Sequence, residues 1–169
     1  MHLAALPLRL ALPALLLGLA ACAPAPIYKA TAATLVATPA QVAQTPERYA
    51  HAPVIWGGRI VGVKNFSDHS EIEVLAYPLD GSQRPKFSAP GNGRFIATVR
   101  GYIEPMNYPA GAPITVDGQL AGTRGGKVGD ADYLFPLVEL AQSHVWSAEE
   151  MRGGHPNVHF GVGLGVGIR

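Results

Sequence analysis

From residue 54 onward, apolar and polar side chains alternate along the chain in several short runs. In the run 70–79, Ile72 and Val74 fall on one face, while Glu71 and Glu73 fall on the other. Alternation with a period of two is typical of strands that bury one face. The same pattern predicts five strands, over 54–64, 70–79, 94–104, 113–123 and 133–146.

Three of these strands carry a glycine with an apolar residue two positions before it and another two positions after it. These glycines are Gly58, Gly101 and Gly118. A mid-strand glycine weakens an ordinary strand, so it indicates a bend or a close approach of two backbones. Strongly curved sheets need such kinks. The segment 123–130 contains the Gly-Gly pair of a hairpin turn. The pattern therefore predicts an all-β fold, a small five-stranded, OB-like β-barrel that is partly open.

The first 21 residues have a different composition. Arg9 precedes an apolar stretch that ends at Ala21, which is shorter than the roughly 20 apolar residues of a membrane-spanning helix. A charged start, an apolar run and small residues are typical of a secretory signal. Its end, Leu19-Ala20-Ala21-Cys22, resembles the lipobox of bacterial lipoproteins. We therefore expect a cleaved signal peptide over 1–21 and a lipid on Cys22.

Cys22 is the only cysteine of the chain, so it cannot form an internal disulfide or a cysteine-rich metal site. The alternatives are a buried apolar cysteine or a disulfide to another molecule. One acyl chain anchors a protein only marginally, whereas two signals give stable attachment. The bacterial lipoprotein modification supplies more than one chain. We therefore expect a stable lipid anchor, with one domain in the remaining residues.

Two segments flank the barrel domain predicted over 46–147. Residues 22–45 are rich in Ala, Pro and Thr, which is typical of a flexible tether. Within them, Thr38 before Pro39 predicts the start of a short helix. Residues 148–169 are glycine-rich. This tail is either disordered or an edge strand that lies against lipid or a partner, which would make the protein a self-associating module.

The residues between Pro39 and Trp146 resemble the Slp family of starvation-inducible outer-membrane lipoproteins. The resemblance is carried by Trp56-Gly57-Gly58, Tyr77-Pro78-Leu79, Gly93-Arg94-Phe95, Gly101 to Pro105, Tyr108, Gly111, Thr115-Val116-Asp117-Gly118, Gly129, Tyr133, Pro136 and Trp146. It implies a lipid-anchored protein of the outer membrane, associated with starvation, stationary phase and acid stress, for which no catalytic residues are established. Ala23, in place of the aspartate that typically retains lipoproteins at the inner membrane, agrees with that location.

Charge and motifs exclude several classes of function. The chain has 13 Lys and Arg against 12 Asp and Glu, a balance that argues against a nucleic-acid partner. His155 and His159 are four residues apart, but Gly154 and Pro156 disfavour the helix that would present both to a metal. The sequence has no nucleophile elbow, phosphate loop or zinc-protease motif. We expect no metal and no cofactor.

Arg94, Arg100 and Tyr102 form the most plausible ligand surface, because they share the outward row of one predicted strand. Two guanidinium groups and an aromatic ring suit an anionic glycan or a lipid headgroup. The alternative is a solvated barrel exterior. Glu71 and Glu73 are either a pair in which one pKa is raised for catalysis or, as we expect, two solvated side chains.

The sequence thus predicts a non-enzymatic envelope module at the outer membrane, with an envelope protein or a glycan as its partner. The alternative from another class is an envelope hydrolase that cleaves glycans or peptidoglycan with carboxylates near the barrel loops. Trp56 and Trp146 are expected to pack in the core or at its rim.

Overall fold

The structure is a computed structural model that describes residues 25–153. The predicted signal peptide, Cys22 and the glycine-rich residues 154–169 lie outside the described residues. The strands are β1 (Pro53–Asn65), β2 (His69–Tyr77), β3 (Arg94–Arg100), β4 (Pro113–Val128) and β5 (Ala131–Val145). The helices are α2 (Pro39–Gln44) and α3 (Ala148–Met151), with 3-10 turns η2 (Pro46–Tyr49) and η3 (Pro105–Asn107).

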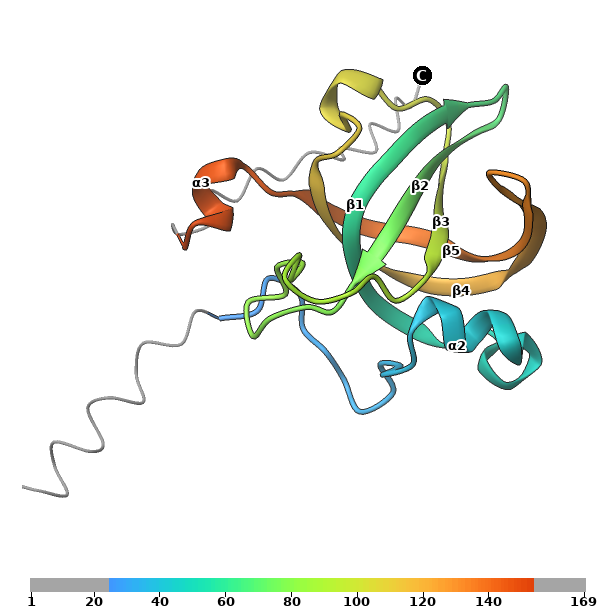
Figure 1. Cartoon of the computed structure of the whole chain (residues 1–169), viewed down its shortest axis with the longest axis horizontal. Helices are drawn as coiled ribbons and strands as arrows, with labels where there is room; N and C mark the ends of the chain where they lie inside the picture. Colours follow the sequence, from blue (N-terminus) through green and yellow to red (C-terminus); the bar gives the residue numbers. More distant parts are fainter. Residues whose placement is uncertain (1–24, 154–169) are drawn as a thin grey trace, which may run out of the picture.

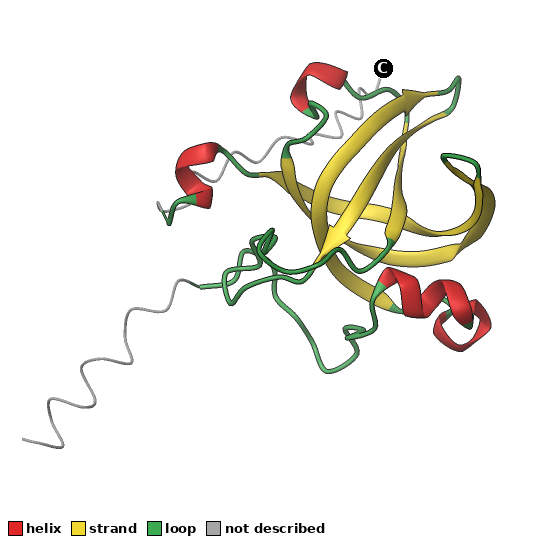
Figure 2. Cartoon of the chain, viewed as in Figure 1, coloured by secondary structure: helices red, strands yellow, loops and turns green. Residues whose placement is uncertain are grey.

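The five strands form one barrel in the order β1-β2-β3-β5-β4 (Figures 1 and 2). Neighbouring strands are antiparallel, except that β3 and β5 pair in parallel over 96–98 and 137–139. The predicted five-stranded, OB-like barrel is confirmed. The prediction that it is partly open is corrected, because β1 pairs with both β2 and β4 and so closes the barrel.

The side chains predicted to face inward fill the barrel. Alternate residues of β1 to β4 are buried there, because successive side chains point to opposite sides of a strand. With Val138 of β5 and Val42 of α2 they form one core cluster. The members of the cluster are Val42, Val54, Trp56, Ile60, Ile72, Val74, Ala76, Phe95, Ala97, Ile114, Val116, Leu120 and Val138.

Two of the three mid-strand glycines mark close backbone approaches, as predicted. A Cβ at Gly58 would collide with the carbonyl oxygen of Leu75, and one at Gly118 with the carbonyl oxygen of Glu139. Gly101 bends the chain as predicted, but its predicted position within a strand is wrong. β3 ends at Arg100, and Gly101 has a φ of +78°, a conformation that glycine adopts without steric cost and that turns the chain out of the strand.

The β4–β5 hairpin is longer than predicted. Its turn lies at residues 129–130, whereas the Gly-Gly pair predicted to form the turn stays within β4. The register shifts between Leu120 and Thr123, and Gly122 has a φ of +112°. This irregularity bends β4, so that the outer part of the hairpin curves away from the barrel wall (right side of Figure 1).

The N-terminal residues of the described chain pack on the barrel, although we predicted a flexible tether over 22–45. The predicted short helix is confirmed as α2, with Thr38 and Gln41 in a reciprocal capping box. Val42 of α2 belongs to the core, and Trp56 donates its indole N–H to the carbonyl of Ala37 at 3.0 Å. The domain therefore begins earlier than residue 46.

Tyr28 fixes the segment before α2. Its backbone N–H donates to Gln83 Oε1 at 2.7 Å, and its carbonyl accepts from Gln83 Nε2 at 2.8 Å. Both residues are buried. The segment runs beside the loop that follows β2, as the blue and green traces in Figure 1 show. Only the residues before 25 remain as the predicted tether, and they lie outside the described part of the chain.

The two tryptophans are buried, which confirms their predicted packing role. Trp146 donates its indole N–H to Thr115 Oγ1 at 2.9 Å, and that hydroxyl donates to the carbonyl of Gln83 at 2.6 Å. The loop after β2 also contacts α3, because Arg84 donates to the carbonyl of Glu150. Over residues 25–153, no helix has the length and apolar character needed to cross a membrane.

Candidate ligand-binding site

A pocket of about 220 Å³ lies on the outer face of the barrel, between the β1–β2–β3 sheet and the curved part of the β4–β5 hairpin. Loops and strands in this position form the ligand-binding face of many OB-folds. Its lining combines apolar and charged side chains: Val61, Gly62, Val63, Lys64, Glu71, Glu73, Ile96 and Arg124.

The strand register brings the lining residues together. Gly62 of β1 stands opposite Glu73 of β2, and Glu73 stands opposite Ile96 of β3. A bulge in β1 between Ile60 and Gly62 shifts the register just before these rows. No heavy atom lies within 4 Å of the place where a Cβ would stand on Gly62. The missing side chain of Gly62 therefore leaves open space in the pocket.

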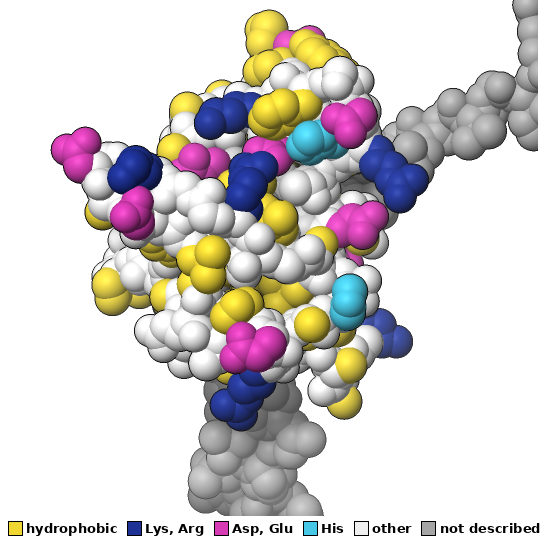
Figure 3. Space-filling model, turned by 90° about the vertical axis from the view of Figure 1, so that its right-hand side faces the viewer, with side chains coloured by type: hydrophobic (Ala, Val, Ile, Leu, Met, Phe, Trp, Pro, Cys, Tyr) yellow, Lys and Arg dark blue, Asp and Glu magenta, His cyan; other side chains and the backbone are white. Residues whose placement is uncertain are grey.

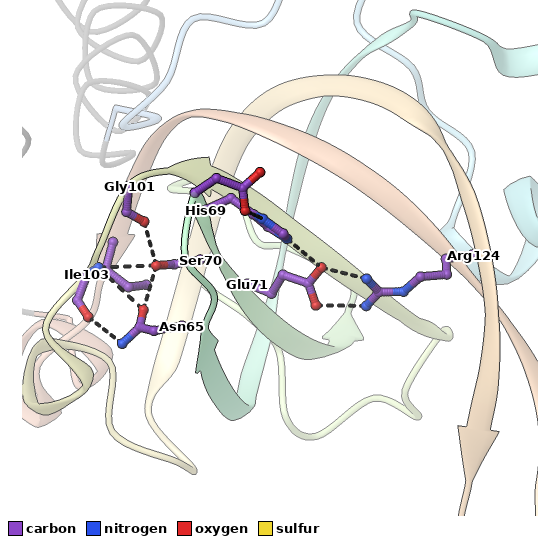
Figure 4. Close-up of polar contacts among 8 residues, drawn as sticks. Asn65, His69, Ser70, Glu71, Gly101, Ile103 and Arg124 are labelled. Carbon is purple, nitrogen blue, oxygen red and sulfur yellow. Dashed lines mark hydrogen bonds and ion pairs between the residues drawn. The ribbon is translucent and has the colours of Figure 1, made fainter.

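Glu71 is the buried charge of the site. Its side chain is 5% exposed, and it accepts two hydrogen bonds from Arg124, one to each oxygen, at 2.6 and 2.7 Å (Figure 4). This bidentate contact is the main reason that the pKa of Glu71 lies below its usual value. The prediction that Glu71 is a solvated side chain is therefore wrong.

His69 extends this ion pair toward the tip of the β1–β2 hairpin. Its Nδ1 lies 2.7 Å from Asp68 Oδ1, and its Nε2 lies 3.3 Å from Glu71 Oε1. The ring stacks on Phe66 with centroids 4.6 Å apart. The hydrogen bond to Asp68 is the largest cause of a raised pKa at His69. Charges of alternating sign thus run from Asp68 to Arg124.

A second group of hydrogen bonds fixes the rim of the site (Figure 4). The buried hydroxyl of Ser70 lies 2.6 Å from the carbonyl oxygen of Gly101 and accepts from the N–H of Ile103 at 3.2 Å. Asn65 donates its side-chain amide to the carbonyl of Ile103 at 3.1 Å. These contacts hold the β1–β2 hairpin, which carries Lys64 and Glu71, against the chain that follows β3.

Glu73 is the second carboxylate of the pocket. Arg94 donates Nη1 to Glu73 Oε1 at 2.6 Å, and both side chains are partly exposed. The backbone N–H of Arg94 donates to the hydroxyl of Tyr133 at 2.7 Å, which links β3 to the curved hairpin.

The three residues predicted as a ligand surface lie on or beside the outward row of β3. Arg94 is tied to Glu73, Arg100 is exposed at the end of the strand, and Tyr102 is 68% exposed and donates to Glu104 Oε2 at 3.3 Å. Arg94 and Arg100 are about 20 Å apart along the strand. Only Arg94 contacts a residue that lines the pocket, and the three side chains do not form one cluster.

The sequence did not identify Arg124, Lys64 or Gly62 as site residues. Arg124 reaches Glu71 across 53 positions of sequence, and only the bend in β4 makes that possible. The sequence did contain one indication of the site, because Glu71 and Glu73 share the outward face of one strand. Two acidic residues on a strand face require partners when that face is covered.

Charged side chains of both signs are interspersed on the face shown in Figure 3, without a large area of one sign. Within residues 25–153, no group of three or more His, Cys, Asp or Glu side chains is arranged so that it could hold a metal ion.

Three curated proteins are similar to the chain over about half of its length. An uncharacterized protein of Haemophilus influenzae is 39% identical over 92 residues, which cover 54% of this chain and 50% of that protein. The uncharacterized lipoprotein YeaY of Escherichia coli K12 is 32% identical over 91 residues, covering 54% and 47%. The outer membrane protein Slp of Escherichia coli K12 is 28% identical over 96 residues, covering 57% and 50%. The matched part of this chain thus spans about half the length of each relative.

Among solved structures, a small single-stranded DNA-binding protein from Streptomyces coelicolor is similar, with a TM-score of 0.37 and 12% identity. The match covers 59% of this chain and 97% of that protein.

The sequence profile of the outer membrane lipoprotein Slp family matches residues 19–162. This range holds all five strands, the pocket and Cys22. The match confirms the predicted family and, with it, the predicted location at the outer membrane. The chain belongs to the outer membrane lipoprotein Slp family.

Proposed function

We propose that the protein is held at the outer membrane by lipid on Cys22 and acts there as a non-enzymatic binding module. The observation that carries the binding role is the open pocket on the outer face of the barrel, with Glu71 and Arg124 held in fixed positions beside it. Membership of the family supports the location. The lipobox ending in Cys22, which lies inside the matched range, supports the site of attachment.

The geometry of the two carboxylates favours binding over hydrolysis. A glycan hydrolase needs a general acid whose pKa is raised so that it is protonated near neutral pH. At Glu71 the pKa is lowered instead, chiefly by the hydrogen bonds from Arg124. Glu73 is paired with Arg94. Both carboxylates are therefore held in ion pairs with arginine side chains, whereas a general acid must carry a proton.

We place the activity in the envelope during starvation or stationary phase, as the family resemblance implies. Arg94 contacts Glu73 of the pocket, and Arg100 and Tyr102 are exposed further along the chain. Together they would extend the surface that an envelope protein or an anionic glycan contacts. Guanidinium groups bind carboxylates and phosphates by paired hydrogen bonds, and an exposed tyrosine ring packs on a sugar.

The anchor is tested by growing cells with an alkyne-tagged fatty acid and comparing the protein with its Cys22→Ser variant. We expect the label on the wild-type protein in the outer-membrane fraction, and neither label nor membrane attachment for the serine variant. A Ser67→Ala variant, altered at a solvent-exposed turn position, is the control and should be labelled normally. A Cys22→Ser protein that is still labelled and still fractionates with the outer membrane would contradict the proposal.

A further inference from the structure

Charged groups of both signs face the same small pocket. Lys64 and Arg124 contribute positive charge, and Glu71 and Glu73 contribute negative charge. These charges are not equally occupied. Arg124 and Glu71 neutralise each other in the bidentate contact. Glu73 is paired with Arg94 through one oxygen, so the binding capacity that remains is that of Lys64 and of the second oxygen of Glu73.

Lys64 is the available cation. Its side chain is exposed at the pocket rim, and it forms no ion pair with any side chain in residues 25–153. Arg124 lies beside it with its side chain 46% exposed. Two of the five N–H donors of a guanidinium group are used by Glu71. The others remain for a second anionic group.

Glu73 is the available anion. One of its oxygens, Oε1, accepts from Arg94, and Oε2 accepts no hydrogen bond from the described residues. A carboxylate has about four lone-pair positions, so much of its capacity is unused. Glu73 and Lys64 are diagonal neighbours across β1 and β2, which places their Cα atoms about 7–8 Å apart.

The rest of the pocket is apolar and partly empty. Val61, Val63 and Ile96 line it, and the place of a side chain on Gly62 is vacant. A cavity of about 150 Å³ accommodates benzene, so a pocket of about 220 Å³ holds a ligand of about six to ten non-hydrogen atoms.

We propose that this pocket binds a small zwitterion, with its anionic group on Lys64 and Arg124, its ammonium group on Glu73 and a short aliphatic part over Gly62. The proposal deepens the binding role proposed above and rests on it. A ligand of a single charge would meet one of the pocket's charged groups of the same sign at short range, which is unfavourable. Two sources share the required chemistry: a free aliphatic amino acid and a phosphoethanolamine headgroup.

The test is a titration of the full lipoprotein in detergent micelles, followed by amide chemical shifts. The probes are leucine, O-phosphoethanolamine, N-acetylleucine, which lacks the ammonium group, and leucinamide, which lacks the carboxylate. We expect saturable binding of at least one zwitterion, with a Kd on the order of 1 mM or below. Each analogue with a single charge should bind at least about tenfold more weakly than leucine. Preference for leucine or for O-phosphoethanolamine identifies the source.

Variants locate the site. Gly62→Leu fills the vacant space and should abolish binding, whereas Gly81→Leu, at an equally uncrowded glycine outside the pocket, should leave it unchanged. Lys64→Gln should weaken leucine binding at least about tenfold but leave leucinamide unaffected. Its control is Lys86→Gln, an exposed lysine in the loop after β2.

The proposal is overturned if neither zwitterion binds saturably at millimolar concentration, or if N-acetylleucine or leucinamide binds as tightly as leucine. It is also overturned if Gly62→Leu binds like the wild-type protein while it retains the native thermal unfolding transition. None of these results depends on the lipid, so the proposed anchor at Cys22 would stand or fall separately.

Discussion

The Glu71–Arg124 pair joins a buried charge to a half-exposed one, and this difference controls how each substitution acts. The side chain of Glu71 is 5% exposed and that of Arg124 is 46% exposed. Removing the arginine leaves a buried carboxylate whose remaining side-chain partner is His69, whereas removing the carboxylate leaves a guanidinium group that water can reach. The two losses should therefore be unequal.

We expect Arg124→Ala to lower the free energy of unfolding by about 2–3 kcal/mol and Glu71→Gln by about 1 kcal/mol. Urea denaturation at neutral pH measures both. Lys127→Ala is the control in the same hairpin. Lys127 forms an exposed ion pair with Asp132 and a long hydrogen bond to the carbonyl of Asp130, and the loss of these contacts should cost less than about 1 kcal/mol. Equal losses for Arg124→Ala and Glu71→Gln would contradict this description of the pair.

The charge network at the hairpin tip has a defined pH dependence. The pKa of Glu71 is lowered from 4.5, so its contribution is present above that pH and is lost as pH falls through the folded-state pKa. The pKa of His69 is raised from 6.5, so its contribution is present below that pH and is lost as pH rises through the folded-state pKa. Both contributions are complete only between these values.

We therefore expect the stability difference between the wild-type protein and His69→Gln to be larger at pH 5.5 than at pH 9. The first pH lies between the ordinary pKa values of 4.5 for Glu and 6.5 for His, and the second lies above both. Urea denaturation at the two pH values measures the difference. His51→Gln serves as the control because His51 lies in the segment before β1, away from the network. A difference that grows from pH 5.5 to pH 9 would show that His69 acts in its neutral form.

At the scale of the strands, two glycines of β1 have opposite surroundings. A Cβ at Gly58 would collide with the backbone of Leu75 on β2, whereas a Cβ at Gly62 would meet nothing within 4 Å. We expect Gly58→Ala to lower the free energy of unfolding by about 3 kcal/mol, at the upper end of the range for overpacking. Gly62→Ala, the matched control, should change it by less than about 0.5 kcal/mol. Thermal or urea unfolding of both variants measures these changes. Equal losses of stability would refute the close approach between Gly58 and the backbone of Leu75.

The strands were predictable because alternation is a local signal, and burial of one face follows from it directly. The hairpin turn was not. Gly125 and Gly126 have the composition of a turn, but the chain reverses three residues later, at Gly129. The bend at Gly122 depends on a register shift against β5, and such a shift arises from packing between strands. Because the bend brings Arg124 to Glu71, the pocket could not be predicted either.

At the scale of the whole molecule, amino-acid composition alone placed the start of the folded domain too late, at residue 46. The Ala, Pro and Thr content of 22–45 is that of a linker, yet Tyr28 binds Gln83 and Val42 enters the core. Partners distant in sequence, including a carboxamide 55 positions away, determine this packing. The consequence concerns the membrane: Tyr28 follows Cys22 by six positions in the chain, and six Cα-to-Cα steps span at most about 22 Å.

With lipid on Cys22, as proposed, this short connection keeps the Tyr28 side of the barrel close to the bilayer. The curved β4–β5 hairpin lies on the other side of the molecule from the N-terminal segment (Figure 1). We therefore expect the pocket beside that hairpin to face away from the membrane. Gly81, in the loop that also carries Gln83, and Lys127, in the hairpin, are exposed positions on the two sides.

Fluorophores attached to Gly81→Cys and Lys127→Cys report the orientation, since the lipid blocks the native thiol. In vesicles that contain a quencher at the lipid headgroups, we expect stronger quenching at position 81 than at position 127. In the Gln83→Ala background, which removes both hydrogen bonds to Tyr28, the difference should shrink because the segment before α2 is released. Equal quenching at both positions in the wild-type background would mean that the barrel rotates freely about its anchor despite the contact between Tyr28 and Gln83.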